Sequence, residues 1–308
     1  MQPVIQVQGL RKSYGDVAAV QGIDFQVSAG EIFAMLGPNG AGKSTTVEIL
    51  EGLRPRDGGE VSVLGIDPGR DSDRLKSKIG VALQSTAFPG KIKLFELIDL
   101  YGKLYRSKPN VKQLLERFDL SDKSKALYET LSGGQRQKVA LILAMINDPP
   151  IVFLDEPSSG LDAHTRRTIH DWLRELRTQG RTVFLTTHYI HEAQQLSDRV
   201  AILQQGKIIR QGTLAELSAG LSLESEIRFQ TAQPLDPAIA EKFPGVVGVR
   251  VEDGAYTVRV TQAADAISAL VRHLDAAGNR LSDIEVSSPT LEDLFLKLTG
   301  ERMPEVTS

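Results

Sequence analysis

Short apolar runs alternate with helical segments through the first two thirds of the chain. The runs at residues 32–36, 79–83, 151–154 and 182–185 are mostly apolar and rich in β-branched or aromatic residues. Continuous apolar runs of this length are typical of strands that are buried on both faces. Such strands form a parallel sheet covered by helices, so the pattern predicts an α/β core.

Helical periodicity fills the stretches between these runs. Residues 90–147 contain helical periods and no convincing strand, which predicts an inserted helical subdomain. Residues 200–203 and 207–210 predict a closing hairpin. Two sets of apolar residues, spaced as one helix face requires, are Val139, Ile142, Leu143 and Ile146, and Ile169, Trp172, Leu173 and Leu176.

The composition of the chain changes near residues 218–225, where small and polar residues predict a linker. Beyond it, alternation at 227–229, a hairpin around Asp253 and Gly254, a helix over 264–276 and a strand at 284–286 predict a small α+β domain. Thr290 and Asp293 have the spacing of a capping box, which predicts a last helix. We therefore expect a domain over residues 1–220 and an accessory or regulatory domain over residues 221–308.

Composition narrows the possible functions. The 308 residues contain 36 Lys and Arg against 39 Asp and Glu, and this balance argues against sequence-independent nucleic-acid binding. The absence of Cys excludes disulfides, thiolate metal sites and Cys nucleophiles. The longest apolar run, 139–146, is far shorter than the roughly 20 residues of a membrane-spanning helix, so we expect a soluble cytoplasmic protein.

A phosphate-binding loop is the clearest chemical motif. The spacing G-x-x-x-x-G-K-S is met by Gly37, Pro38, Asn39, Gly40, Ala41, Gly42, Lys43 and Ser44, between a predicted strand and a predicted helix. Glycines allow backbone N–H groups to converge on a phosphate, Lys43 adds a positive charge, and Ser44 offers a hydroxyl to Mg²⁺. We expect Val47, Leu50 and Leu53 on the buried side of the following helix.

Two carboxylates end the apolar run at 151–154. We expect Asp155 to hold Mg²⁺, from the strand beside the phosphate-binding loop. Glu156 follows it and is placed to orient or deprotonate the attacking water.

A third motif, Leu131-Ser132-Gly133-Gly134-Gln135, precedes a predicted helix and is read locally as an anion site. Together with the phosphate-binding loop and the paired carboxylates in this order, it resembles the ATP-binding cassette (ABC) ATPases, whose signature is LSGGQ. The resemblance covers about residues 3–220. It implies a P-loop NTPase fold with a RecA-like core, an antiparallel β subdomain and the inserted helical subdomain.

The resemblance assigns roles residue by residue. Tyr14 is similar to the aromatic residue that stacks on adenine, and Thr45 follows the loop's Ser44 at the nucleotide. Gln84 resembles the glutamine that touches Mg²⁺ and senses a membrane partner, and His188 resembles the switch histidine at the γ-phosphate. Asp162, in Ser159-Gly160-Leu161-Asp162, resembles the D-loop residue at the dimer interface. The other histidines, His164, His170, His191 and His273, match no motif and are expected on the surface.

The resemblance also implies partners. In this family two cassettes pair head to tail, so Ser132, Gly133, Gly134, Gln135 and Asp162 of one copy complete the ATP site of the other. The implied cofactors are ATP and Mg²⁺, and the catalytic residues are Lys43, Gln84, Glu156 and His188. A homodimer without spanning helices then requires separate membrane permease subunits, which hold it at the cytoplasmic face of the membrane.

The residues 84–91 and 288–295 resemble the ATPases of type 2 ABC exporters, the group that includes the daunorubicin-resistance exporters. After Gln84 the chain has Ile92-Lys93-Leu94-Phe95-Glu96, which keeps the Glu of the usual Thr-Val-Arg-Glu-like run and loses its Arg. The expected function is ATP hydrolysis that drives export of a drug, lipid or other substrate. The alternatives are the ATPase of an ABC importer and an ABC ATPase without a transport role.

Overall fold

The computed structural model describes residues 3–83, 88–218, 224–252, 254–287 and 290–299. The chain divides into two compact units, one that runs to Leu214 and one that covers Ala215–Arg302. The domain boundary expected at residues 220–221 falls outside the described residues and stays a prediction.

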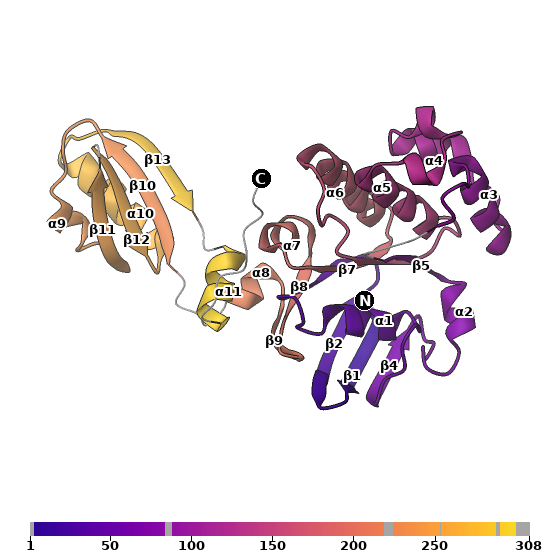
Figure 1. Ribbon diagram of the computed structural model, residues 1–308. Coiled ribbons are helices and arrows are strands. Elements are labelled where there is room, and N and C mark those ends of the chain that lie inside the picture. The colour runs from indigo at the N-terminus through magenta and orange to yellow at the C-terminus, as the bar shows by residue number, and fades with distance from the viewer. Residues whose placement is uncertain (1–2, 84–87, 219–223, 253, 288–289, 300–308) are drawn as a thin grey trace. The chain divides into compact units, whose positions relative to one another are not determined.

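A six-stranded sheet in the order β5-β6-β7-β3-β8-β9 forms the centre of the first unit (Figure 1). Its neighbours pair in parallel except β8 and β9, which form the predicted hairpin. The strands are β3 (Ile32–Leu36), β5 (Ile79–Ala82), β6 (Ile151–Asp155), β7 (Thr182–Thr187), β8 (Arg199–Gln204) and β9 (Lys207–Gly212). The helices beside them are α1 (Lys43–Leu50), α2 (Ser72–Lys76), α5 (Gly133–Ala144), α6 (Ala163–Thr178) and α7 (Ile190–Leu196). The short helix α8 (Leu214–Ser218) begins at the last residue of the first unit.

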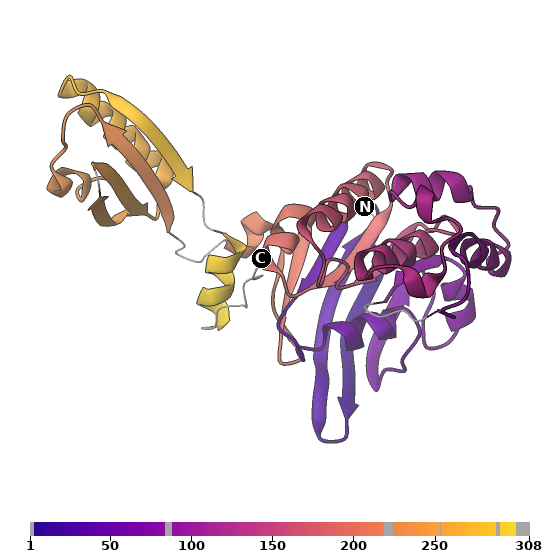
Figure 2. The same cartoon turned by 45° about the horizontal axis from the view of Figure 1, so that its top comes forward.

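A row of aromatic side chains fills one face of the central strands. Phe33, Phe184 and Phe153 lie opposite one another on β3, β7 and β6. The ring centroids of Phe33 and Phe184 are 5.5 Å apart, and those of Phe153 and Phe184 are 5.7 Å apart. Phe25 of the neighbouring sheet stacks on Phe33 at 5.6 Å. The two sheets therefore share one core, and α5, α6 and α7 cover the opposite face (Figures 1 and 2).

That neighbouring sheet is antiparallel, with the order β2-β1-β4, as the family resemblance implies. Its strands are β1 (Pro3–Tyr14), β2 (Val17–Ser28) and β4 (Gly58–Val63). The predicted helical subdomain is also present, and its described elements are α3 (Leu94–Leu104), α4 (Val111–Arg117), the short 3₁₀ helices η1 (Ser121–Lys123) and η2 (Tyr128–Thr130), and α5.

The strand order corrects one expectation. Asp155 ends β6, and β7 lies between β6 and β3, so the Asp155 strand is not beside the strand of the phosphate-binding loop. The chain crosses from β6 through α6 to β7, and β7 then pairs with β3. The carboxyl ends of parallel strands lie at one edge of the sheet, so Asp155 still reaches the site across one intervening strand.

The end of α1 corrects a second expectation. The helix stops at Leu50, and Gly52 adopts a φ of +70°. The N–H groups of Gly52 and Leu53 donate to the carbonyls of Ile49 and Glu48, at 3.1 and 2.8 Å, which is a Schellman C-cap. Leu53 therefore lies beyond the helix and is 50% exposed rather than buried. Ile146 likewise lies beyond the end of α5, although it is buried.

The second unit is the predicted α+β domain. Its sheet has the order β11-β12-β10-β13, and Figures 1 and 2 show α10 along one face. Leu270 and Leu274 of α10 pack with Phe229 and Val258 of the sheet. The Thr290 N–H donates to Asp293 at 2.8 Å and caps the last helix as expected. The elements are β10 (Ser225–Thr231), α9 (Pro237–Ala240), β11 (Val246–Glu252), β12 (Ala255–Val260), α10 (Ala263–Ala276), β13 (Leu281–Ser287) and α11 (Leu291–Thr299).

Candidate active site

The phosphate-binding loop connects β3 to α1, as the motif predicts. A Cβ atom at Gly37 would lie 2.2 Å from the Leu203 carbonyl oxygen, and one at Gly42 would lie 2.3 Å from the Ala19 carbonyl oxygen. These two glycines are therefore required by close contact with neighbouring backbone, and not only by the approach of a phosphate. Gly40 has a φ of +79°, and a Cβ atom placed there would have no neighbour within 4 Å. The space beside Gly40 is therefore open to an approaching phosphate.

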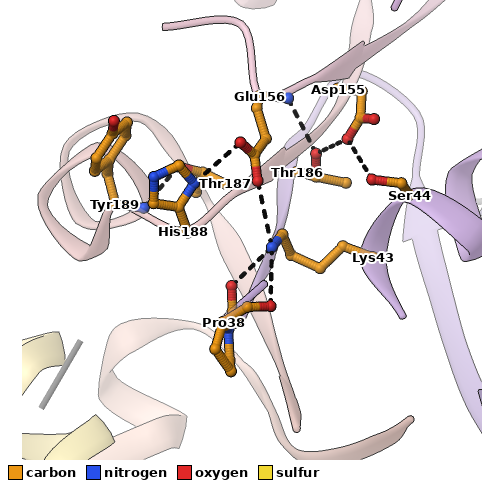
Figure 3. Close-up of polar contacts among 10 residues, drawn as sticks. Pro38, Lys43, Ser44, Asp155, Glu156, Thr186, Thr187, His188 and Tyr189 are labelled. Carbon is orange, nitrogen blue, oxygen red and sulfur yellow. Dashed lines mark hydrogen bonds and ion pairs between the residues drawn. The ribbon is translucent and has the colours of Figure 1, made fainter. Parts of the chain in front are cut away.

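Lys43 points its amine back across the loop (Figure 3). Its Nζ donates to the carbonyl oxygens of Gly37 and Pro38 at 2.8 and 3.2 Å and lies 3.4 Å from Glu156 Oε1. Burial lowers the pKa of Lys43, and the nearby carboxylate of Glu156 opposes that shift. The loop thus holds a buried cation among oxygen atoms, which is the kind of group that binds a phosphate anion.

Ser44 and Asp155 supply oxygen atoms next to each other. The Ser44 hydroxyl donates to Asp155 Oδ1 at 3.3 Å, and the Thr186 hydroxyl also donates to Asp155 Oδ1 (Figure 3). The Glu156 N–H donates to Thr186 Oγ1 at 3.1 Å. Thr186 therefore holds the side chain of Asp155 and the backbone of Glu156, although no sequence motif assigns it a role. It takes this position because it pairs with Asp155 across β6 and β7, a pairing between distant segments that leaves no local signal in the sequence.

Glu156 lies just beyond β6 with a φ of +49°, a left-handed conformation that is uncommon for a residue with a side chain. Such conformations gather at functional sites, where the surrounding structure holds them. Glu156 Oε2 lies 3.0 Å from His188 Nδ1, while Oε1 faces Lys43 (Figure 3). The two sequence-predicted residues Glu156 and His188 are thus brought together, although 32 positions separate them.

Lys43, Ser44 and Glu156 line a cavity of about 490 Å³, within the range of ligand-binding pockets. Its described lining residues are Tyr14, Ala19, Asn39, Gly40, Gly42, Lys43, Ser44, Thr45 and Glu156. Tyr14 is 40% exposed, and the guanidinium carbon of Arg54 lies 5.2 Å from its ring centroid. The lining fits ATP, because it combines an aromatic ring, Tyr14, with the buried cation of Lys43. The hydroxyl of Ser44 and the carboxylate of Asp155 fit Mg²⁺, which takes a few protein oxygens together with phosphate oxygens.

The signature residues lie elsewhere. Ser132 caps α5, and its hydroxyl accepts from the Gln135 N–H at 3.3 Å while Gln135 Oε1 accepts from the Ser132 N–H at 2.9 Å. Asp162 caps α6 and accepts from the Thr165 N–H at 2.9 Å, and these hydrogen bonds lower the Asp162 pKa. The described lining of the 490 Å³ cavity does not include Ser132, Gly133, Gly134, Gln135 or Asp162. The carbonyl groups of Gly37 and Pro38 face Lys43, and Ala41 of the same loop is buried. Gln84 lies outside the described residues.

One expectation about the histidines is wrong. His170 is buried on α6, with its Nε2 atom 3.2 Å from Glu192 Oε1 and 3.4 Å from Ser158 Oγ. His170 directly follows Ile169, on the apolar face predicted for this helix, but only the contacts with residues distant in the chain show that the imidazole is buried.

Known proteins resemble the chain over nearly its whole length. The family model "ABC transporter" matches residues 20–159, and the model "ATP-binding protein DrrA1-3-like, C-terminal domain" matches residues 212–299. The daunorubicin resistance ATP-binding protein DrrA3 of Streptomyces coeruleorubidus is 36% identical over 303 residues, which is 96% of each protein. The Nod factor export ATP-binding protein I of Rhizobium sp. (strain N33) is 36% identical over 306 residues, covering 97% of this chain and 98% of that protein.

The fold has solved relatives as well. The dimeric, post-hydrolysis structure of the cassette MJ0796 bound to ADP and Pi superposes with a TM-score of 0.63 at 28% identity, covering 68% of this chain and 98% of that one. No helix among the residues that the structure describes is long and apolar enough to cross a bilayer. The resemblance inferred from the motifs is confirmed. The chain belongs to the ATP-binding proteins of the ABC transporter family, in the group of the daunorubicin-resistance (DrrA) ATPases.

Proposed function

We propose that this chain is the ATP-hydrolysing subunit of an ABC exporter. The observation that carries the proposal is that Glu156 lines the cavity together with Lys43 and contacts both Lys43 and His188, while Ser44 of the same cavity contacts Asp155. Export, rather than import, is supported by relatives named for drug resistance and for Nod factor export. The exported substrate class, a drug, a lipid or another molecule, is set by separate membrane permease subunits that place this chain at the cytoplasmic face.

The proposed roles follow from the contacts. Lys43 and the loop amides bind the β- and γ-phosphates, and Tyr14 stacks on adenine. Ser44 and Asp155, with Gln84 as a further predicted ligand, hold Mg²⁺, which neutralises charge on the phosphates when bound. Glu156 takes the proton of the attacking water, and His188 fixes the Glu156 carboxylate and contacts the γ-phosphate.

A second copy of the chain completes the proposed site. The signature residues Ser132, Gly133, Gly134 and Gln135, and Asp162, stand apart from the cavity of their own chain. The solved cassette relative is a dimer, which supports a homodimer in which these residues meet the nucleotide of the partner. Closure on ATP and opening after hydrolysis then give the stroke that the permease uses.

The substitution Glu156→Gln tests the assignment. It keeps the shape of the side chain and removes the base, so hydrolysis should fall by about 10²- to 10⁴-fold while ATP still binds. Size-exclusion chromatography with light scattering should then show an ATP-dependent dimer. Glu116→Gln, at an exposed position of α4, is the matched control. Normal turnover by Glu156→Gln would remove Glu156 from the catalytic role.

A further inference from the structure

An aromatic ring lies directly against His188. The ring centroids of His188 and Tyr189 are 4.0 Å apart, and the two ring planes are tilted by 44° (Figure 3). The Tyr189 N–H donates to Thr187 Oγ1 at 2.9 Å, so the backbone on either side of His188 is also fixed. The phenol ring therefore limits the orientations that are open to the imidazole whose Nδ1 atom faces Glu156.

Arg166 of α6 contacts the ring of Tyr189 in turn. Its guanidinium carbon lies 5.9 Å from the Tyr189 ring centroid, which is within the range of a cation–π interaction. Its Nη2 atom donates to the Leu161 carbonyl at 3.0 Å, and its Nε atom is buried and has no hydrogen-bond partner among the described residues. Cation–π contacts strengthen as the cation loses water. The guanidinium is thus anchored to the loop before α6 while it stacks on Tyr189.

A second contact between α6 and α7 supports this stack. His170 follows Arg166 by four positions and Glu192 follows Tyr189 by three, so the members of each pair lie on one helix face. His170 Nε2 lies 3.2 Å from Glu192 Oε1, and both side chains are buried. The stack of Arg166 on Tyr189 therefore lies between two segments that are also fixed to each other one turn further on.

We propose that Arg166 and Tyr189 are positioning residues of ATP hydrolysis, which hold the imidazole of His188 against the carboxylate of Glu156. The inference rests on the proposed function, because that function gives Glu156 and His188 their roles. Glu156 Oε2 lies 3.0 Å from His188 Nδ1, and an imidazole rotated away from that contact no longer orients the carboxylate. The described lining of the 490 Å³ cavity includes neither Arg166 nor Tyr189, so both act through His188 and not on the nucleotide.

Substitutions that remove the stack test this role. Tyr189→Leu keeps an apolar side chain and removes the aromatic face, and Arg166→Gln removes the cation. Each should lower kcat for ATP hydrolysis by the full-length chain about tenfold, because a small displacement of a catalytic group is enough for such a loss. KM for ATP should change by less than about twofold, since the nucleotide contacts remain.

Two matched variants serve as controls. Tyr189→Phe keeps the ring and should recover most of the kcat that Tyr189→Leu loses, which a requirement for apolar bulk alone would not produce. Arg167→Gln removes a cation at the exposed neighbouring position of α6 and should hydrolyse ATP as wild type does. Circular dichroism checks that each variant is folded. Arg166→Gln leaves the packing of Tyr189 in place, so the inference stays testable if Tyr189→Leu fails to fold.

Double variants separate the positioning of His188 from a general effect on the fold. His188→Ala removes the imidazole, so nothing remains for the stack to position. In that background, Tyr189→Leu or Arg166→Gln should lower the single-turnover rate by less than about twofold further, whereas effects that are independent of His188 multiply.

Three results would overturn the inference: wild-type kcat in Tyr189→Leu or Arg166→Gln, a change in KM in place of kcat, or losses that multiply with that of His188→Ala. Each leaves the proposed function intact, because the wild-type chain still hydrolyses ATP. A wild-type chain that hydrolyses no ATP, or normal turnover by His188→Ala, would instead count against the proposed function itself.

Discussion

At the scale of the residue, the buried carboxyl groups of Glu156 and Glu51 have different surroundings. Glu156 has a side chain that is 7% exposed and faces the charged or polar groups of Lys43 and His188. Glu51 has no hydrogen-bond partner among the described residues, and its pKa is raised by burial. The carboxyl group of Glu156 faces a cation, whereas burial disfavours the charged form of the Glu51 carboxyl group.

This difference gives Glu51 a defined pH signature. A carboxyl whose pKa is raised in the folded state binds more protons folded than unfolded, so its stability contribution is retained below its ordinary pKa of 4.5 and lost as pH rises. Glu51→Gln removes this dependence, and its stability advantage over wild type should therefore grow from pH 5 to pH 8. Urea unfolding of both proteins across that range measures the trend.

The groups that face Glu51 bear on that measurement. Asp155 and Glu48 carry like charges, and a cavity of about 320 Å³ is lined by Glu51 together with Lys76, Tyr101 and Tyr105. Lys76→Gln, which removes a charge from that cavity while keeping Glu51, is the control and should retain the wild-type trend. An advantage for Glu51→Gln that stays constant with pH would show that Glu51 is not a neutral buried acid.

At the scale of the element, His170 connects segments that flank the catalytic residues. It lies on α6 and contacts Glu192 on α7 and Ser158 in the loop after β6. Ser158 follows Glu156 by two positions, and Glu192 follows His188 by four. This buried contact set therefore fixes the loop of Glu156 and the helix after His188 against each other.

Removing the imidazole should be costly. In His170→Phe, the buried Glu192 loses its partner, and we expect the free energy of unfolding to fall by about 3 kcal/mol. The double change with Glu192→Leu should recover part of that loss, because no unpaired acid remains. Urea unfolding measures both, and His164→Phe, at an exposed position of the same helix, should change stability little. Equal stability of His170→Phe and wild type would argue against the role of this contact.

The elements also show what the sequence could reveal. The apolar runs and the loop motif predicted β3, β6, β7 and α1, because burial on both faces and a glycine-rich turn leave a local pattern. The place of β7 between β6 and β3 leaves no such pattern, since pairing is decided between segments far apart in the chain. For the same reason the role of Thr186 could not be predicted, because it depends on the pairing of Thr186 with Asp155. The exposed Leu53 was missed because its spacing continues the helix face beyond the Gly52 cap.

At the scale of the whole molecule, the proposed dimer predicts complementation between defective chains. Lys43→Ala removes the phosphate contact and Ser132→Arg obstructs the signature, so each homodimer should lose ATPase activity. A mixed dimer retains one intact site, built from Lys43 of one chain and Ser132 of the other. Because half of the dimers mix at random, an equimolar mixture should recover up to about a quarter of wild-type activity.

ATPase assays of the separate and mixed variants measure this recovery. Nucleotide binding by Ser132→Arg is the control, since its own Lys43 loop is unchanged. A mixture as inactive as its components, with both variants folded and able to dimerise, would contradict a site shared between two copies.

The contacts of Lys43 imply that nucleotide binding is an exchange rather than a simple addition. Before a phosphate enters, the ammonium group already has the carbonyls of Gly37 and Pro38 and the carboxylate of Glu156 as neighbours. An incoming phosphate must compete with that carboxylate, so part of its binding free energy goes into displacing it. Under the proposed roles, a phosphate that binds Lys43 therefore releases the base that will act on it.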